Sequence, residues 1–147
     1  MDRKEAFKYI VQRTMLIPFG KMHYYPSIPE KVKDKVIKSF DANMDFDDVI
    51  AFYDSTLFGN NNNGMLFTIT GAYYLCIFEK PFYFNYEDIN NILIIPDKKG
   101  RYFGIDAQLS ISFSNGKSLN IGPDDFYKEN IRELLYTMKK QFSKCNG

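Results

Sequence analysis

The amino-acid sequence predicts a mainly β domain of the α+β class, with two helices before the strands and one helix after them. Fourteen Phe and eleven Tyr among 147 residues are typical of strands and of a core built from large flat side chains. Several short apolar runs are separated by turn residues, and a long amphipathic stretch closes the chain. A chain of 147 residues is long enough to form one core without a disulfide or a metal.

Two helices are predicted before the strands. The first spans residues 2–16, where apolar side chains recur at helical spacing and Pro18 follows the last of them. Residues 21–28 are expected to form a connector. The second helix spans residues 29–40, because Pro29 suits the first position of a helix and apolar residues follow it at helical spacing.

About seven strands are predicted between residue 41 and the last helix. Each is an apolar or aromatic run bounded by turn residues. The runs are residues 49–53, 65–70, 72–78, 82–86, 89–95, 105–113 and 117–121. Residues 105–113 are apolar at every second position, and the Asn115-Gly116 pair after them is a strong hairpin signal. Short connections require antiparallel neighbours, which indicates a bent sheet or a partly open barrel.

The last helix is predicted over residues 123–143. Pro123 and two aspartates suit its first turn, and lysines suit its last turn. We interpret residues 1–40 as an N-terminal helical extension and residues 41–147 as the β domain with its C-terminal helix.

Part of the chain resembles the pleckstrin-homology (PH) superfold in the number and order of its strands and in its final helix. Residues 49–59 and the run Gly64-Met-Leu-Phe-Thr-Ile-Thr-Gly-Ala-Tyr-Tyr are similar to the first two hairpins of bacterial PH-like proteins. Residues 79–89 continue this similarity, which covers about residues 47–143. The resemblance implies a PH-like barrel, and folds of this kind serve many unrelated binding roles.

The resemblance does not imply a lipid site on the first hairpin loop. Eukaryotic PH domains that bind phosphoinositides use Lys and Arg there. Residues 59–64 of this chain are Gly-Asn-Asn-Asn-Asn-Gly, without a positive charge. These asparagines suit left-handed turn geometry.

Charge, cysteine usage and hydropathy narrow the function classes. The net charge of +1 combines +5 over residues 1–40, −8 over residues 41–97 and +4 over residues 98–147. Because the basic surplus is divided between the two ends, nucleic-acid binding is not favoured. No apolar run approaches the ~20 residues of a membrane span, and no signal peptide is visible. Cys76 in an apolar run and Cys145 near the end fit a reducing compartment, so a cytoplasmic location is expected.

The sequence offers no set of residues that suits catalysis or metal binding. The only histidine, His23, has too few neighbouring ligands for a zinc site or a catalytic triad. Residues 41–48 imitate the start of an EF-hand loop, but Phe46 and Phe52 stand where calcium loops need Gly and Glu. We therefore predict no enzymatic activity, no metal and no cofactor.

Basic side chains on a turn and on a helix are the candidate binding sites. Cations beside aromatic residues on the predicted turn at residues 98–101 could meet a phosphate, a lipid head group or an acidic partner. A solvated turn and a solvated helix face are the alternative interpretations. The candidate binding residues are Lys98, Lys99, Arg101, Tyr102, Lys31, Lys35 and Lys38.

The function predicted from these features is that of a non-enzymatic binding module. Protein–protein interaction comes first, with an unidentified protein segment received at an exposed strand edge or in a groove beside the C-terminal helix. The alternative is peripheral binding to anionic lipid or phosphate surfaces through the basic patches.

Overall fold

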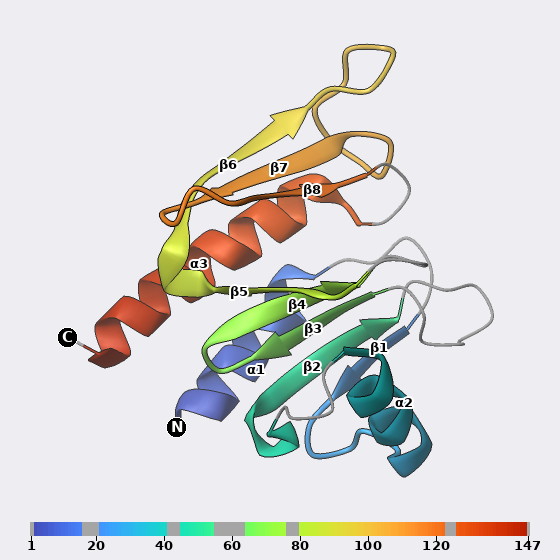
Figure 1. The fold of residues 1–147 in the computed structure, drawn as a ribbon, viewed down its shortest axis with the longest axis vertical. Coiled ribbons are helices and arrows are strands. Elements are labelled where there is room, and N and C mark those ends of the chain that lie inside the picture. The colour runs from blue at the N-terminus through green and yellow to red at the C-terminus, as the bar shows by residue number, and fades with distance from the viewer. Residues whose placement is uncertain are drawn as a thin grey trace. The chain divides into compact units, whose positions relative to one another are not determined.

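The computed structural model of the protein describes residues 2–15, 21–40, 45–54, 64–75, 80–122 and 126–146. Within these residues there are three α-helices and eight strands, and the strands form two antiparallel sheets (Figure 1). The predicted α+β class and the C-terminal helix are confirmed. The described strands form no closed barrel.

The chain packs as two compact units. Unit 1 comprises Met1–Tyr9 and Phe19–Phe84, and unit 2 comprises Ile10–Pro18 and Asn85–Gly147. Helix α1 (Arg3–Thr14) therefore supplies residues to both units. The predicted boundary after residue 40, between an N-terminal helical extension and the β domain, stays a prediction.

Unit 1 is built on a five-stranded sheet whose strands hydrogen-bond in chain order. The strands are β1 (Lys21–Tyr24), β2 (Val49–Asp54), β3 (Gly64–Thr68), β4 (Gly71–Leu75) and β5 (Phe82–Asn85). Every residue of β2 and β3 is buried, so both faces of these two strands are covered. Near-continuous apolar runs are typical of strands in this position.

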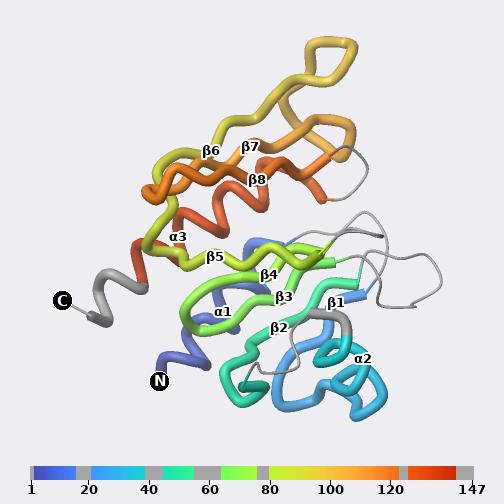
Figure 2. Tube along the Cα trace, viewed as in Figure 1, coloured from blue at the N-terminus to red at the C-terminus, as the bar shows by residue number. Residues whose placement is uncertain are grey.

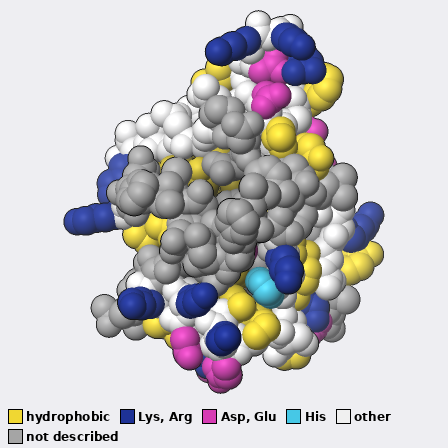
Figure 3. Space-filling view, turned by 90° about the vertical axis from the view of Figure 1, so that its right-hand side faces the viewer, with side chains coloured by type: hydrophobic (Ala, Val, Ile, Leu, Met, Phe, Trp, Pro, Cys, Tyr) yellow, Lys and Arg dark blue, Asp and Glu magenta, His cyan; other side chains and the backbone are white. Residues whose placement is uncertain are grey.

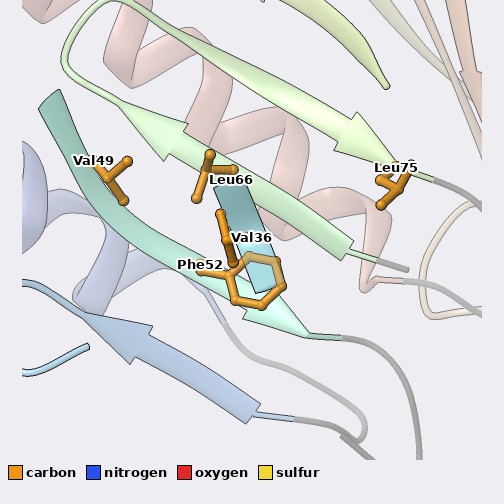
Figure 4. Packing of buried hydrophobic residues seen from close by; sticks show 5 residues of the cluster. All are labelled: Val36, Val49, Phe52, Leu66 and Leu75. Atoms are coloured by element: carbon orange, nitrogen blue, oxygen red, sulfur yellow. The ribbon is translucent and has the colours of Figure 1, made fainter. Parts of the chain in front are cut away.

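Helix α2 (Glu30–Phe40) covers one face of this sheet. Its Val36 is fully buried and packs against apolar side chains of three strands (Figure 4). These side chains are Val49, Phe52, Leu66 and Leu75. Val32 of the same helix is partly buried against this cluster.

The structure corrects the prediction of a connector at residues 21–28. Lys21–Tyr24 forms strand β1 at the edge of the sheet, where His23 lies opposite Phe52 of β2. The two rings stack with centroids 6.2 Å apart. An edge strand keeps polar side chains, so its sequence lacks the alternation that identifies half-buried strands.

Unit 2 consists of a three-stranded sheet and helix α3 (Lys128–Asn146), which runs along the sheet (Figure 2). The strands are β6 (Ile89–Ile95), β7 (Gln108–Phe113) and β8 (Ser118–Ile121), in that order. Alternate residues of β7 and one stripe of α3 are buried. The buried side chains are Leu109, Ile111, Phe113, Ile131, Leu134, Leu135 and Met138. The predicted Asn115-Gly116 hairpin joins β7 to β8, and Gly116 has a φ of +85°.

Three further predictions are corrected in this part of the chain. A single bent sheet or partly open barrel is replaced by two sheets, because the 3-10 helix η2 (Tyr86–Asp88) separates β5 from β6. Strand β7 begins at Gln108 rather than at residue 105. Helix α3 begins at Lys128, since Phe126 and Tyr127 are not helical; the predicted start at Pro123 itself lies outside the described residues.

Some sequence predictions fall on other residues that the structure does not describe. These are Cys76, the side chain of Cys145, the asparagine tract at residues 60–63 and most of the EF-hand-like segment.

Candidate functional site

Four of the seven predicted binding residues lie on one loop of unit 2. This is the β6–β7 loop (residues 96–107), which carries Lys98, Lys99, Arg101 and Tyr102. The other three, Lys31, Lys35 and Lys38, lie on α2 in unit 1. They are exposed and follow one another by four and three residues, so they form one stripe of that helix.

Asp97 fixes the first half of the β6–β7 loop. Its Oδ1 accepts hydrogen bonds from the backbone N–H of Lys99 at 2.8 Å and of Arg101 at 3.0 Å. Arg101 Nε donates to Asp97 Oδ2 at 2.7 Å. The Arg101 backbone N–H is the main reason that the pKa of Asp97 lies below its usual value. A turn of this geometry needs a left-handed residue, and Gly100 supplies it with a φ of +78°.

The first turn of α3 fixes the second half of the loop. Glu129 Oε2 accepts a hydrogen bond from the backbone N–H of Gly104 at 2.9 Å. Lys128 Nζ donates to the backbone oxygens of Ile105 at 3.1 Å and Phe126 at 2.7 Å. Because the Lys128 side chain is fully buried, its ammonium group needs these acceptors. The loop is therefore held by hydrogen bonds on both sides.

This loop presents two aromatic side chains to solvent. Tyr102 is 60% exposed and Phe103 is 63% exposed. On the outward side of β6, Leu93 is 58% and Ile95 is 44% exposed. We refer to Leu93, Ile95, Lys98, Lys99, Tyr102 and Phe103 as the loop surface. Tyr102 and Phe103 are neighbours in sequence, and exposed apolar side chains that lie together mark interaction sites more often than scattered ones do.

A shallow pocket joins the basic part of the loop to the outward face of the sheet. Its volume is about 420 Å³, and it reaches from the loop to Gln108, which lies opposite Ile95 in the register of β6 and β7. The lining residues are Pro96, Asp97, Lys98, Lys99, Arg101, Asp106 and Gln108. In Figure 3 basic and acidic side chains gather at the top of the view, over this loop.

The charges of the loop are not equivalent. Arg101 is paired with Asp97 and also lies 3.8 Å from Asp106. Within the described part of the chain, Lys98 and Lys99 form no ion pair. Arg101 therefore orders the loop, whereas Lys98 and Lys99 are the cations available to an anionic partner.

The free edge of β6 is largely blocked. Among the described strands only β7 pairs with β6. Tyr136 Oη accepts a hydrogen bond from the Ile92 N–H at 2.9 Å, and Lys139 Nζ donates to the Ile89 oxygen. Since outward N–H groups alternate along a strand, Ile94 is the next to face the edge, and after it Pro96 has no N–H. The edge thus offers little to an added strand, and the side chains of the loop surface remain the larger target.

The described part of the chain was expected to hold no metal site, and its potential metal ligands are scattered. There, no group of three or more His, Cys, Asp or Glu side chains could hold a metal ion. His23 packs on Phe52, and burial lowers the pKa of its ring. No helix within the described ranges is both long enough and apolar enough to cross a membrane.

Sequence reasoning missed Leu93 and Ile95 as surface residues. Residues 92–95 are all apolar, so their composition does not tell which side chains face the core. The register with β7 settles this, because Leu93 lies opposite Ser110 and Ile95 opposite Gln108.

Comparison with known protein families, with curated proteins and with solved structures found no match to this chain. The resemblance to PH-like proteins therefore stays a prediction, and the functional argument depends on the geometry of the chain itself.

Proposed function

We propose that the protein is a non-enzymatic binding module, in which the loop surface receives an acidic protein segment that also carries apolar side chains. The observation that carries this proposal is the exposure of Tyr102 and Phe103 on a loop that is held on both sides. A cytoplasmic location is part of the same proposal.

The two aromatic rings supply the affinity. A Tyr or Phe side chain buries about 150–250 Å² when it is fully covered. Covering the exposed part of each ring contributes about 3 kcal/mol at ~25 cal/mol per Å². Because hydrogen bonds already order the loop, binding loses less conformational entropy than it would on a mobile loop.

Lys98 and Lys99 supply the preference for an acidic segment. Neither is paired within the described residues, so an approaching carboxylate replaces only water. These lysines are exposed, and their attraction therefore weakens as salt rises. The aromatic contribution does not depend on salt in this way.

The partner is expected to contact side chains rather than to extend the sheet. On β6, Tyr136 occupies the Ile92 N–H, Lys139 occupies the Ile89 oxygen, and Pro96 after the strand has no N–H to offer. This favours a segment that lies across the face over one that adds a strand at the edge.

The test compares proteins captured from source extract by the wild type and by a Tyr102→Ala/Phe103→Ala variant. A partner that is lost with this variant, and that cross-links to the loop through an acidic segment, supports the proposal. The matched control is Lys31→Ala/Lys35→Ala, which removes exposed charges of α2 in unit 1 and should retain the partner. Capture of the same proteins by wild type and aromatic variant would contradict the proposal.

A second candidate function is peripheral binding to anionic membranes. It is favoured by the same aromatic pair, because Tyr and Phe beside lysines suit the interface of a charged bilayer. Sedimentation with vesicles of rising phosphatidylserine content at low salt separates the two functions. Binding that rises with anionic lipid and is lost in the aromatic variant would favour the membrane.

A further inference from the structure

A second pocket lies in unit 1 and shares no residue with the loop surface. Its volume is about 280 Å³, near the small end of ligand-binding pockets. It is formed by the start of α1, the segment that leads into α2, α2 itself, and the 3-10 helix η1 (Phe46–Asp48) with the start of β2. The lining residues are Lys4, Tyr25, Pro26, Ile28, Glu30, Lys33, Phe46, Asp47 and Val49.

Tyr25 holds the lysines of α1 in place. The ammonium groups of Lys4 and Lys8 lie 4.1 and 5.0 Å from the centroid of its ring. Its hydroxyl donates a hydrogen bond to Glu5, which raises the pKa of Tyr25 to about 12. Lys8 also lies 3.7 Å from Glu5, so its charge is balanced. Lys4 instead donates to the backbone oxygen of Asp47.

Lys33 enters the pocket from the α2 side. Its ammonium group lies 5.3 Å from the centroid of the Phe46 ring. Neither Lys33 nor Lys4 forms an ion pair with a carboxylate of the described chain. Two ammonium groups are thus positioned by aromatic rings and keep donors for an added anion.

Apolar side chains also line the pocket, and a ligand can contact them. Ile28 is half-buried and packs against the buried cluster that contains Val49, so part of its side chain faces the pocket. Pro26 adds a flat surface beside Tyr25. A ligand without an apolar part would leave this surface in contact with water.

The two carboxylates that line the pocket oppose an anion only weakly. Glu30 and Asp47 are exposed, whereas Lys4 and Lys33 are half-buried. Charges in water are screened more strongly than charges against an apolar wall. The charges of the two half-buried lysines are therefore screened less than those of the two exposed carboxylates.

We propose that this pocket binds a small organic anion: a carboxylate or phosphate monoester group held by Lys4 and Lys33, on a compact apolar body that covers Pro26 and Ile28. The site is independent of the proposed partner-binding function, which depends on unit 2 alone.

The test is a titration followed by the backbone amide NMR signals of Lys33, Phe46 and Val49. Four probes are used: phenyl phosphate, benzoate, inorganic phosphate and benzyl alcohol. Saturable shifts with phenyl phosphate or benzoate, and weaker shifts with the two probes that lack a charge or a ring, support the proposal. The stronger of the first two probes identifies the acid group.

Charge variants of α2 sharpen this test, because their expected effects have opposite signs. Lys33→Gln should weaken binding about fivefold, and Glu30→Gln should tighten it, since one removes attraction and the other repulsion. Lys31→Gln is the matched control on the same helix and should change nothing, because Lys31 does not line the pocket. Equal binding of benzyl alcohol, equal binding of inorganic phosphate, an unaffected Lys33→Gln variant, or no shift with any probe would each overturn the proposal.

Discussion

Lys128 is fully buried, and its ammonium group bonds to the backbone oxygens of Ile105 and Phe126. Lys128→Met keeps most of the side-chain volume but leaves both oxygens without this donor. We expect the free energy of unfolding to fall by about 1–3 kcal/mol. Urea denaturation measures this loss, and Lys140→Met, on the exposed side of α3, should stay within about 0.5 kcal/mol of wild type. Equal losses in both variants would show that these hydrogen bonds contribute little.

His23 makes stability depend on pH. Burial lowers the pKa of its ring from 6.5, more than Asp54 raises it, so the folded chain favours the neutral form. The unfolded chain then binds more protons between the two pKa values, and stability is complete above pH 6.5 and falls below it. The free energy of unfolding should be lower at pH 5.5 than at pH 8. His23→Gln should remove this difference, because His23 is the only histidine in the chain; an unchanged pH dependence would contradict the assignment.

The surroundings of Lys128 and His23 could not be predicted from the sequence. A lysine at the start of a helix is usually solvated, and only the folded loop brings carbonyl oxygens to Lys128. His23 was placed in a connector, because the pairing with β2 that stacks it on Phe52 joins segments about thirty residues apart.

At the scale of elements, Tyr136 of α3 protects the edge of β6 through its bond to the Ile92 N–H. Tyr136→Phe removes that acceptor and should cost about 0.5–1.5 kcal/mol. Hydrogen exchange of the Ile92 amide should become faster in this variant. Tyr102→Phe removes an exposed hydroxyl elsewhere in unit 2 and serves as the control. Unchanged exchange at Ile92 would mean that another group covers the edge.

Most of the helices and strands could be predicted from local patterns in the sequence. Alternating residues of β7 and the Asn115-Gly116 turn identify their hairpin, and the apolar stripes identify the helices. Strand β1 was missed because an edge strand carries mixed side chains. The starts of β7 and α3 were placed too early, and the segment between them makes long-range bonds, from Gly104 to Glu129 and from Lys128 to Ile105, that local patterns do not reveal.

At the scale of the whole molecule, α1 contributes to both compact units. In unit 1, Phe7 is buried and Arg3 donates to the Ile69 oxygen at 3.3 Å. In unit 2, Val11 is buried and the Thr14 oxygen accepts a bond from Asn130 Nδ2 at 2.9 Å. The first helix is therefore expected to stabilise both units.

Removal of residues 2–15 tests this expectation. Amide hydrogen exchange should become faster at Met65 in unit 1 and at Ile111 in unit 2, since each unit loses buried apolar side chains. Gln12→Ala, an exposed position of α1, should leave both unchanged. Unchanged protection after the removal would contradict a stabilising role of α1 in both units.

Neither the division into two sheets nor the unit 1 pocket could be predicted from the sequence, because both depend on contacts between segments that are distant in the chain. The pocket combines Lys4, Tyr25, Lys33 and Phe46, which come from four separate segments. Only tertiary packing brings these four side chains together. The β6–β7 loop was found because its cations and aromatic residues are neighbours in sequence.

The bonds that hold the β6–β7 loop come from the side chains of Asp97, Arg101, Lys128 and Glu129 and from the backbone of the loop itself. The side chains at positions 98, 99, 102 and 103 take no part in the bonds that hold it. A library randomised at these four positions should therefore keep the fold in most of its members. Selection can change what the chain recognises without weakening the scaffold, so new specificities can evolve here at little cost in stability.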